Sequence, residues 1–176
     1  MLELQPSDYH DIAYLFEDLP YGISIPNSVI AGIGSGRVFV NRAAQPTAAF
    51  VYNYGACTLA GNAKDHAFAE QVCRWLLKYE GQDYFILYAH PEAWEGVLED
   101  EFGTTVPKLR RLDFDLNPSK FALLGGWYNN IPAGYELQRI DEVLMQQVRK
   151  MVFPYSQSYW RSAADFERHG LGFCIM

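Results

Sequence analysis

The sequence has little of what marks secreted, membrane or metal proteins. It holds three cysteines without a CxxC pair, and four scattered histidines without an HExxH motif. We therefore expect free thiols in a reducing cytoplasm, and no metal site. No run approaches the roughly 20 apolar residues that span a membrane. The acidic N-terminus lacks the basic region of a signal peptide, so we expect no membrane partner.

Positive charge is also scarce. The chain has 14 Lys and Arg against 21 Asp and Glu, which gives a formal net charge of −7. Nucleic-acid binding relies on basic side chains that neutralise phosphates, so we expect no nucleic-acid partner. The basic cluster of Lys108, Arg110 and Arg111 is interpreted as the solvated face of a strand. An anionic cofactor stays possible, because backbone N–H groups at a helix start can bind phosphate.

Apolar and aromatic residues are plentiful. They make up 49% and 15% of the 176 residues, enough for the packed core of one domain, or of one domain plus a fragment.

The first 116 residues predict an α/β (α+β) fold with a mixed, mostly antiparallel sheet flanked by helices. Three strand-like runs joined by short turns predict an antiparallel meander. An apolar stripe through Phe68, Val72, Trp75, Leu76 and Tyr79 predicts a helix that Asn62 could cap. The expected elements are a helix at 8–18 capped by Ser7, a loop at 22–36 with a short strand at 28–31, strands at 37–41, 47–54 and 57–60, a helix at 63–79, a strand at 83–90, a helix at 91–102 and a strand at 104–116.

Residues 117–134 are rich in Gly, Pro and Asn and predict a linker. After them we expect a strand at 135–140, a helix from Asp141 to about 153, a helix from Ser156 or Ser158 to His169, and an apolar strand at 171–176. The apolar pattern of that last strand predicts that it enters a core, which suggests that the fold continues beyond Met176. Its apolar edge also suggests a homodimer through this strand.

The element order from residue 37 onward resembles the core of the GNAT superfamily of acyl-CoA-dependent N-acetyltransferases. The family's helix-start motif, Gln/Arg-x-x-Gly-x-Gly/Ala, corresponds here to LAGNAK; its glycine and alanine are present and its initial Gln or Arg is absent. The resemblance implies that acetyl-CoA is the cosubstrate. Its pyrophosphate would lie at Gly61, Asn62, Ala63 and Lys64, and its acyl arm between two splayed strands. The strand backbone near Leu59 would supply an oxyanion contact.

Residues 135–176 resemble the start of a second GNAT unit. The run WRSAADFERHGLGFCIM is similar to the two-lobed branch that includes zwittermicin-resistance-type acetyltransferases, whose first lobe is degenerate and whose second lobe is catalytic. The resemblance implies a first lobe over 1–116, a linker over 117–134, and an incomplete second lobe over 135–176.

Each candidate catalytic or binding residue has a functional and a structural interpretation. The resemblance makes Tyr88 a candidate general acid for the departing thiolate; a packed aromatic ring is the alternative. Cys57 and Cys73 lack a histidine at a recognisable spacing and are interpreted as structural thiols. The segment 32–36 (GIGSG) precedes a strand, so it predicts a turn and not a dinucleotide loop.

Three functions therefore stay open. The chain could be an N-acetyltransferase that transfers an acetyl group from acetyl-CoA to a small-molecule amine. It could be a non-catalytic scaffold that shapes a site completed by missing residues or by another chain. It could also be a small-molecule-binding domain unrelated to CoA.

Overall fold

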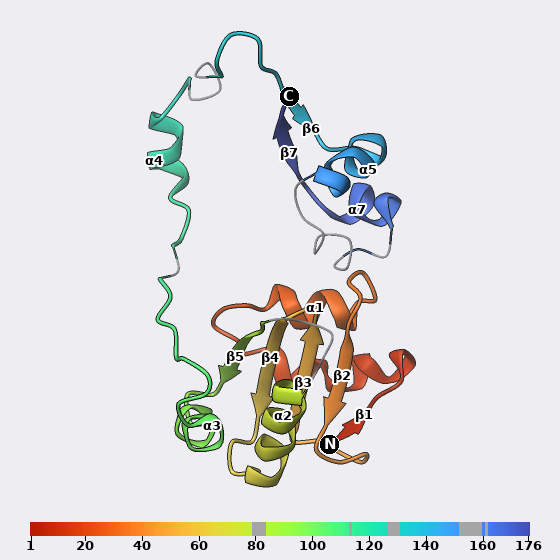
Figure 1. Ribbon diagram of the computed structural model, residues 1–176, viewed down its shortest axis with the longest axis vertical. Coiled ribbons are helices and arrows are strands. Elements are labelled where there is room, and N and C mark those ends of the chain that lie inside the picture. The colour runs from red at the N-terminus through yellow and green to blue at the C-terminus, as the bar shows by residue number, and fades with distance from the viewer. Residues whose placement is uncertain (79–83, 113, 127–130, 152–159, 161) are drawn as a thin grey trace.

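The computed structural model describes residues 1–78, 84–112, 114–126, 131–151, 160 and 162–176. Within these residues a five-stranded sheet has the order β1-β2-β3-β4-β5, and a two-stranded sheet pairs β6 with β7 (Figure 1). The first sheet and its helices comprise β1 (Leu2–Glu3), η1 (Pro6–Phe16), α1 (Ser24–Ile30), β2 (Arg37–Val40), β3 (Ala48–Asn53), β4 (Ala56–Gly61), α2 (His66–Lys78), β5 (Ile86–His90) and α3 (Trp94–Phe102). The rest comprises α4 (Pro118–Leu123), β6 (Leu137–Arg139), α5 (Glu142–Met151), α7 (Ala163–His169) and β7 (Phe173–Ile175).

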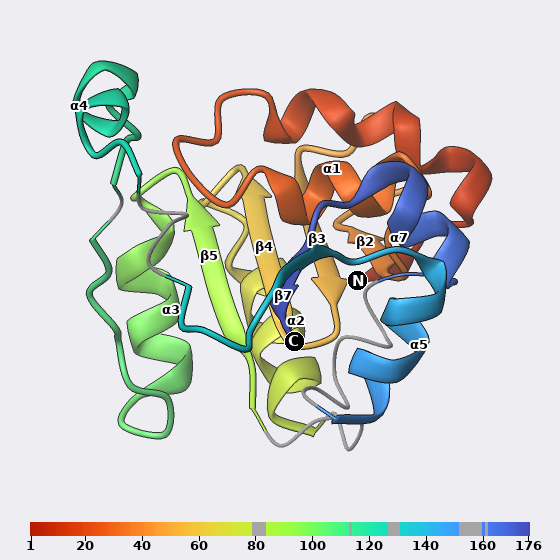
Figure 2. The ribbon, with the colours of Figure 1, turned by 90° about the horizontal axis from the view of Figure 1, so that it is seen from above.

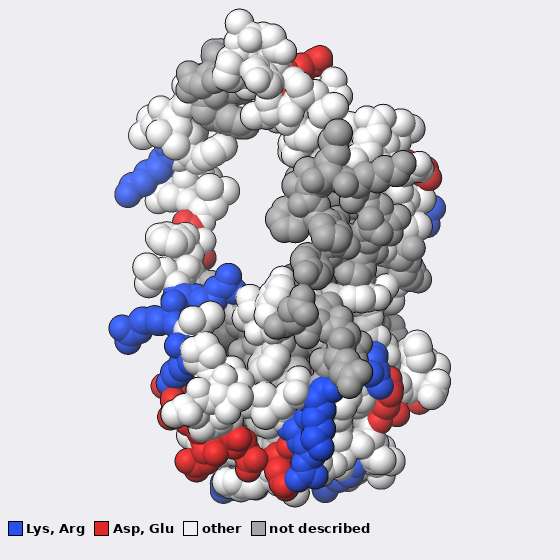
Figure 3. All heavy atoms as spheres, in the orientation of Figure 1, with Lys and Arg blue, Asp and Glu red and all other residues white. Residues whose placement is uncertain are grey.

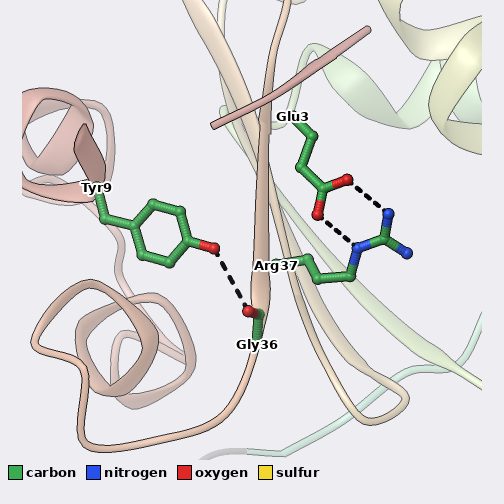
Figure 4. Close-up of polar contacts among 4 residues, drawn as sticks. All are labelled: Glu3, Tyr9, Gly36 and Arg37. Carbon is green, nitrogen blue, oxygen red and sulfur yellow. Dashed lines mark hydrogen bonds and ion pairs between the residues drawn. The ribbon is translucent and has the colours of Figure 1, made fainter. Parts of the chain in front are cut away.

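The predicted antiparallel meander is confirmed: β2 pairs with β3 and β3 with β4, whereas β4 and β5 are parallel. A two-residue turn joins β3 to β4, with φ of 44° at Tyr54 and 86° at Gly55. Positive φ at both central positions fits the right-handed twist of a hairpin. At the sheet edge, Arg37 in β2 forms a two-pronged ion pair with Glu3 in β1, at 2.7 and 2.6 Å (Figure 4).

The first sheet lies between two helical layers (Figure 2). Because side chains alternate along a strand, β3 contributes to both cores. Phe50 and Tyr52 belong to the core with α2, and Ala49 and Val51 to the core with η1 and α1. All six residues of β3 are buried. The predicted fold class, a mixed sheet flanked by helices, is thus what the structure has.

Two local expectations near the N-terminus are wrong. The first helix is a 3-10 helix that starts at Pro6, and Ser7 does not cap it; the Ser7 hydroxyl donates to Asp8. Proline suits the first helical position because its ring fixes φ and it has no N–H group to leave unpaired. The strand expected at 28–31 lies mostly within α1, where the burial of Pro26, Val29 and Ile30 follows a helical period.

The helix α2 confirms the apolar stripe, because Phe68, Val72 and Leu76 are buried. It begins at His66, three residues later than expected at 63. The expected ends at Tyr79 and Asp83, in the helix and the next strand, lie outside the described residues. From Ile86 on, β5 forms as expected, and α3 ends at Phe102 with Gly103 after it.

The strand expected at 104–116 is wrong for the residues that the structure describes there. Leu109, Leu112, Phe114 and Leu116 are 70%, 77%, 87% and 73% exposed. No strand pairs with this run within the described residues, so these four side chains stay exposed, whereas Val106 packs against the core with α2. The described residues 114–126, with α4, stand away from both sheets and border an opening through the molecule (Figures 1 and 3).

The second sheet confirms the strand, helix and strand expected near the C-terminus. Asp141 caps α5 by accepting from the Leu144 N–H at 2.7 Å. Ser162 caps α7; the starts expected at Ser156 or Ser158 lie outside the described residues. β6 and β7 are antiparallel, with Leu137 opposite Ile175. Phe173 and Ile175 are more than half exposed, so β7 does not enter a core here.

Figure 3 shows acidic and basic side chains interspersed around the first sheet, on the face that is visible. None of the described helices combines the length and the apolar character that crossing a bilayer requires.

Candidate functional site

The turn from β4 into α2 uses its backbone donors internally. The Asn62 N–H donates to the Thr47 carbonyl at 2.8 Å. The Lys64 N–H donates to Oδ1 of Asn62 at 3.1 Å, and the Asp65 N–H donates to the Asn62 carbonyl at 3.1 Å. Phosphate binding at a helix start needs such N–H groups to point at the ligand. Three donors of this turn are therefore already engaged.

Asp65 occupies the start of α2 with its own negative charge. Its Oδ1 accepts from the Phe68 N–H at 3.0 Å, which is a helix cap, and its Oδ2 accepts from Nδ2 of Asn41 at 2.8 Å. The positive end of the helix dipole is thus neutralised by a carboxylate that two elements hold in place. A second anion at this position would meet the charge of Asp65.

The close approach of the backbone just before β3 requires a glycine at position 61. Its φ is +98°, and a Cβ there would lie 2.2 Å from the carbonyl oxygen of Thr47. Its neighbour Leu59 is fully buried in the core with α2, and Ala63 is buried too. Of the predicted cofactor residues, Asn62 and Lys64 are exposed.

The strands β4 and β5 stay paired along the whole of β5. The register runs from Ala56 opposite Ile86 to Ala60 opposite His90, one residue before β4 ends at Gly61. The resemblance implies splayed strands at this end, with an acyl arm between them. The described strands do not splay, and the residues at this turn do not fit a diphosphate and its arm. The assignment of acetyl-CoA to this turn stays a prediction.

Tyr88 lies in the middle of β5, opposite Thr58 of β4. Its ring contacts Tyr21 with centroids 5.9 Å apart, and Arg111 donates a hydrogen bond to its hydroxyl. The Arg111 guanidinium also lies 5.7 Å from the Tyr88 ring centroid. Arg111 was expected on a solvated strand face, so this contact was missed: nothing in the local sequence links two residues 23 positions apart. The role of Tyr88 as a general acid stays a prediction.

The two cysteines of the first sheet are protected thiols. Cys57 and Cys73 are both buried. Burial raises the pKa of the Cys57 thiol far above its ordinary value, and burial with the nearby Glu101 charge raises the pKa of Cys73 to about 12. Because the thiolate is the nucleophile, neither cysteine is poised for catalysis. In the part of the chain that the structure describes, no three His, Cys, Asp or Glu side chains gather as metal ligands would.

A cavity that the sequence did not indicate lies at the other end of β4. Its volume is about 300 Å³, and it is bordered by α1, by the β3–β4 turn and by Trp160. Asn53, the last residue of β3, lines it and is 4% exposed. In the sequence Asn53 precedes Tyr54-Gly55 and looks like an ordinary turn residue, so no local signal marks this cavity.

Comparison with known proteins identifies the family. Residues 15–176 match the model of the GNAT acetyltransferase family. The chain is 24% identical over 179 residues to the uncharacterized N-acetyltransferase YdfB of Bacillus subtilis strain 168, covering 99% of this chain and 66% of YdfB. It is similar in fold to the crystal structure of a GCN5-related N-acetyltransferase-like protein from Streptococcus suis 89/1591. There the TM-score is 0.64 and the identity 21%, over 97% of this chain and 66% of that one.

The chain spans just under two thirds of the length of the two relatives, 66% in each case. The family match covers residues 15–176, which include the second sheet and all strands of the first sheet except β1. The predicted lobe boundaries at 116 and 134 stay predictions. Because the family model matches most of the chain, the protein belongs to the GNAT acetyltransferase family.

Proposed function

We propose that this chain serves the transfer of an acetyl group from acetyl-CoA to the amine of a small molecule. Family membership over residues 15–176 is the observation that carries the proposal. The similarity to a protein named as an N-acetyltransferase supports it. Acetyl-CoA supplies the acetyl group as an activated thioester, and the protein's part is to orient donor and amine.

Within this activity we propose that the first sheet is a scaffold and not the donor site. Two observations favour this role: Asp65 caps the start of α2, and β5 stays paired with β4 up to Ala60. In this proposal the donor is held outside β1–β5, by other parts of a longer protein or by another chain. The two-lobed arrangement with a degenerate first lobe, which the sequence resemblance implies, belongs to the same proposal.

Ligand-dependent melting temperature separates the scaffold from a donor site at the predicted turn. A ligand bound only to the native state stabilises that state by mass action. We would measure the melting temperature of the full chain with millimolar acetyl-CoA, for the wild type, for Lys64→Glu and for Lys120→Glu as the charge-matched control. Lys64 and Lys120 are both exposed, so neither change disturbs a core. Gly61 is unsuitable for this test, since any side chain there meets Thr47.

The scaffold role expects no shift in any of the three proteins. A shift in the wild type that Lys64→Glu removes and Lys120→Glu keeps would contradict it, and would support the donor site at Leu59, Gly61, Asn62, Ala63 and Lys64. Release of free CoA thiol from acetyl-CoA in the presence of primary amines provides the second measurement. Turnover by this chain alone would also contradict the scaffold role.

A further inference from the structure

The strand β7 (Phe173–Ile175) has one paired edge and one open edge in the part of the chain that the structure describes. Its partner β6 completes a sheet of only two strands, and α5 and α7 lie on one side of it (Figure 1). A two-stranded sheet is marginal, because independent stability takes three or more strands or packing against a helix. A further strand at the open edge of β7 would therefore stabilise this part of the protein.

The hydrogen-bond ladder shows which backbone groups of β7 point to the open edge. Just outside the two strands, Glu136 and Met176 exchange two hydrogen bonds, at 3.0 and 2.9 Å. Hydrogen-bonded and non-hydrogen-bonded pairs alternate along an antiparallel ladder, so Cys174 also directs its backbone groups towards β6. The N–H and C=O groups of Phe173 and Ile175 therefore point away from β6.

The side chains of β7 divide between two faces. A Cβ at Gly172 would lie 3.0 Å from the Phe166 ring, so this position and Cys174 share the face that α7 covers. Phe173 and Ile175 lie on the opposite face, where they are 55% and 57% exposed. Large apolar side chains beside an open strand edge favour association with another strand.

The edge of β7 lacks the features that keep edge strands apart. Natural edge strands avoid pairing through charged side chains or proline. The run at 170–176 (GLGFCIM) contains neither. β6 differs, since Arg139 lies within it and Glu136 comes just before it. An uncharged, apolar edge suits a strand of the same kind, and a second copy of this chain supplies one.

We propose that two copies of this chain associate through β7, in antiparallel pairing about a twofold axis at Cys174. This register pairs all three residues of β7 with the partner copy. Phe173 of each copy lies opposite the partner's Ile175 and exchanges two backbone hydrogen bonds with it. The product is a four-stranded sheet with the order β6-β7-β7-β6, in which an aromatic ring packs beside a β-branched side chain. The association goes beyond the proposed acetyl transfer.

The twofold axis places Cys174 directly opposite the partner's Cys174. The two form a non-hydrogen-bonded pair, in which the Cα atoms lie about 4.5 Å apart. That separation is within the range of a disulfide. If the exposed sheet faces packed against each other instead, Phe173 and Ile175 would meet and the two Cys174 side chains would lie apart. An interface of two short strands is small, so we expect a weak, reversible dimer.

Analytical ultracentrifugation of the full chain under reducing conditions measures the association, from micromolar to millimolar protein. The mass should rise from the 20.1 kDa of one chain towards twice that value. Ile175→Pro removes an N–H group that β6 does not use, which edge strands tolerate. By symmetry the change removes two hydrogen bonds, so it should weaken the dimer about tenfold or more.

Leu137→Pro is the matched control. Leu137 lies opposite Ile175 in the ladder, so its N–H points to the outer edge of β6. The proline there blocks the wrong edge, and the dimer should persist. The melting temperature of each variant shows whether it is folded.

Diamide, a thiol oxidant, tests the register. It converts two thiols to one disulfide and takes up both hydrogen atoms, so the wild type should give a covalent dimer through Cys174. Cys174→Ser should keep the reversible dimer and lose the covalent one. Cys57 and Cys73 are buried and should not react.

The proposal is overturned if the chain stays monomeric at millimolar concentration, or if folded Leu137→Pro loses the dimer as fully as Ile175→Pro does. A reversible dimer that diamide does not link through Cys174 would overturn the register. None of these outcomes depends on acetyl-CoA, so this proposal and the acetyl-transfer proposal can fail separately.

Discussion

Gly61 and Thr47 approach each other more closely than any side chain at Gly61 would permit. A Cβ on Gly61 would lie 2.2 Å from the Thr47 carbonyl oxygen, and the same oxygen accepts the Asn62 N–H at 2.8 Å. The glycine that matches the family motif is therefore required by the β3–β4 pairing itself. A structural requirement of this kind explains its presence without a bound phosphate.

Replacing Gly61 by alanine should destabilise the fold by about 2 kcal/mol or more, because the positive φ strains an L residue and the Cβ collides with backbone. Urea unfolding measures the change. Gly96 provides the control: it is an exposed residue inside α3 with open space around it. Gly96→Ala should stabilise by about 0.5–1 kcal/mol, since alanine is the better helix former. Equal effects of the two changes would contradict the close approach at Gly61.

The ion pair of Glu3 and Arg37 should make a small, pH-dependent contribution to stability. The hydrogen bond and charge of Arg37 hold the pKa of Glu3 below its ordinary value of 4.5. A carboxyl with a lowered pKa in the folded state stabilises above its unfolded pKa, and this stability is lost as the pH falls through the folded value. Both side chains are about 40% exposed, 39% for Arg37 and 42% for Glu3, so the pair behaves as a surface ion pair.

Glu3→Gln should therefore cost about 0.5 kcal/mol at pH 7 in low salt, and less in 1 M NaCl. The difference from the wild type should shrink towards zero as the pH falls below 4. Thermal unfolding across this range checks the trend. A cost that grows on acidification would have the wrong sign for a lowered pKa.

The three cysteines should differ in reactivity. Cys57 and Cys73 are buried, with the pKa of Cys73 at about 12, whereas Cys174 is partly exposed. Iodoacetamide should therefore label Cys174 first in the folded protein, and the other two only after unfolding. Mass spectrometry of timed samples measures the order. Labelling of Cys73 as fast as that of Cys174, without denaturant, would show that the α2 core is not closed.

Phe114 should be dispensable for stability although it is a large apolar residue. It is 87% exposed in a segment that was expected to form a strand. Phe114→Ser should change the free energy of unfolding by less than about 0.5 kcal/mol, as for most surface substitutions. Leu59, which is fully buried in β4, is the comparison: Leu59→Ala should cost about 2–5 kcal/mol. A large loss of unfolding free energy for Phe114→Ser would show that this segment packs into a core after all.

Sequence reasoning worked where the decisive interactions are local. The three strands from 37 to 61 could be predicted because short turns and β-branched residues determine a hairpin over a few positions. The capping of α5 by Asp141 and the stripe of α2 are local in the same sense.

Sequence reasoning failed where the outcome depends on contacts between distant segments. The sequence indicated Asn62 as the cap of α2, and the structure uses Asp65, whose carboxylate also accepts from Asn41, 24 positions away. The run at 104–116 alternates as a strand does, but alternation supplies no partner strand. The contact of Arg111 with Tyr88 depends on tertiary packing in the same way.

The sequence by itself determined the family, the order of strands and helices from β2 to α3, and which side chains of the first sheet are apolar, because periodicity and turn chemistry act within a few residues. Only the tertiary structure decided that β4 and β5 stay paired at the expected cofactor turn, that Asp65 caps the start of α2, and that Arg111 contacts Tyr88. Each of these depends on the distance between segments far apart in the chain, and no local pattern encodes that distance.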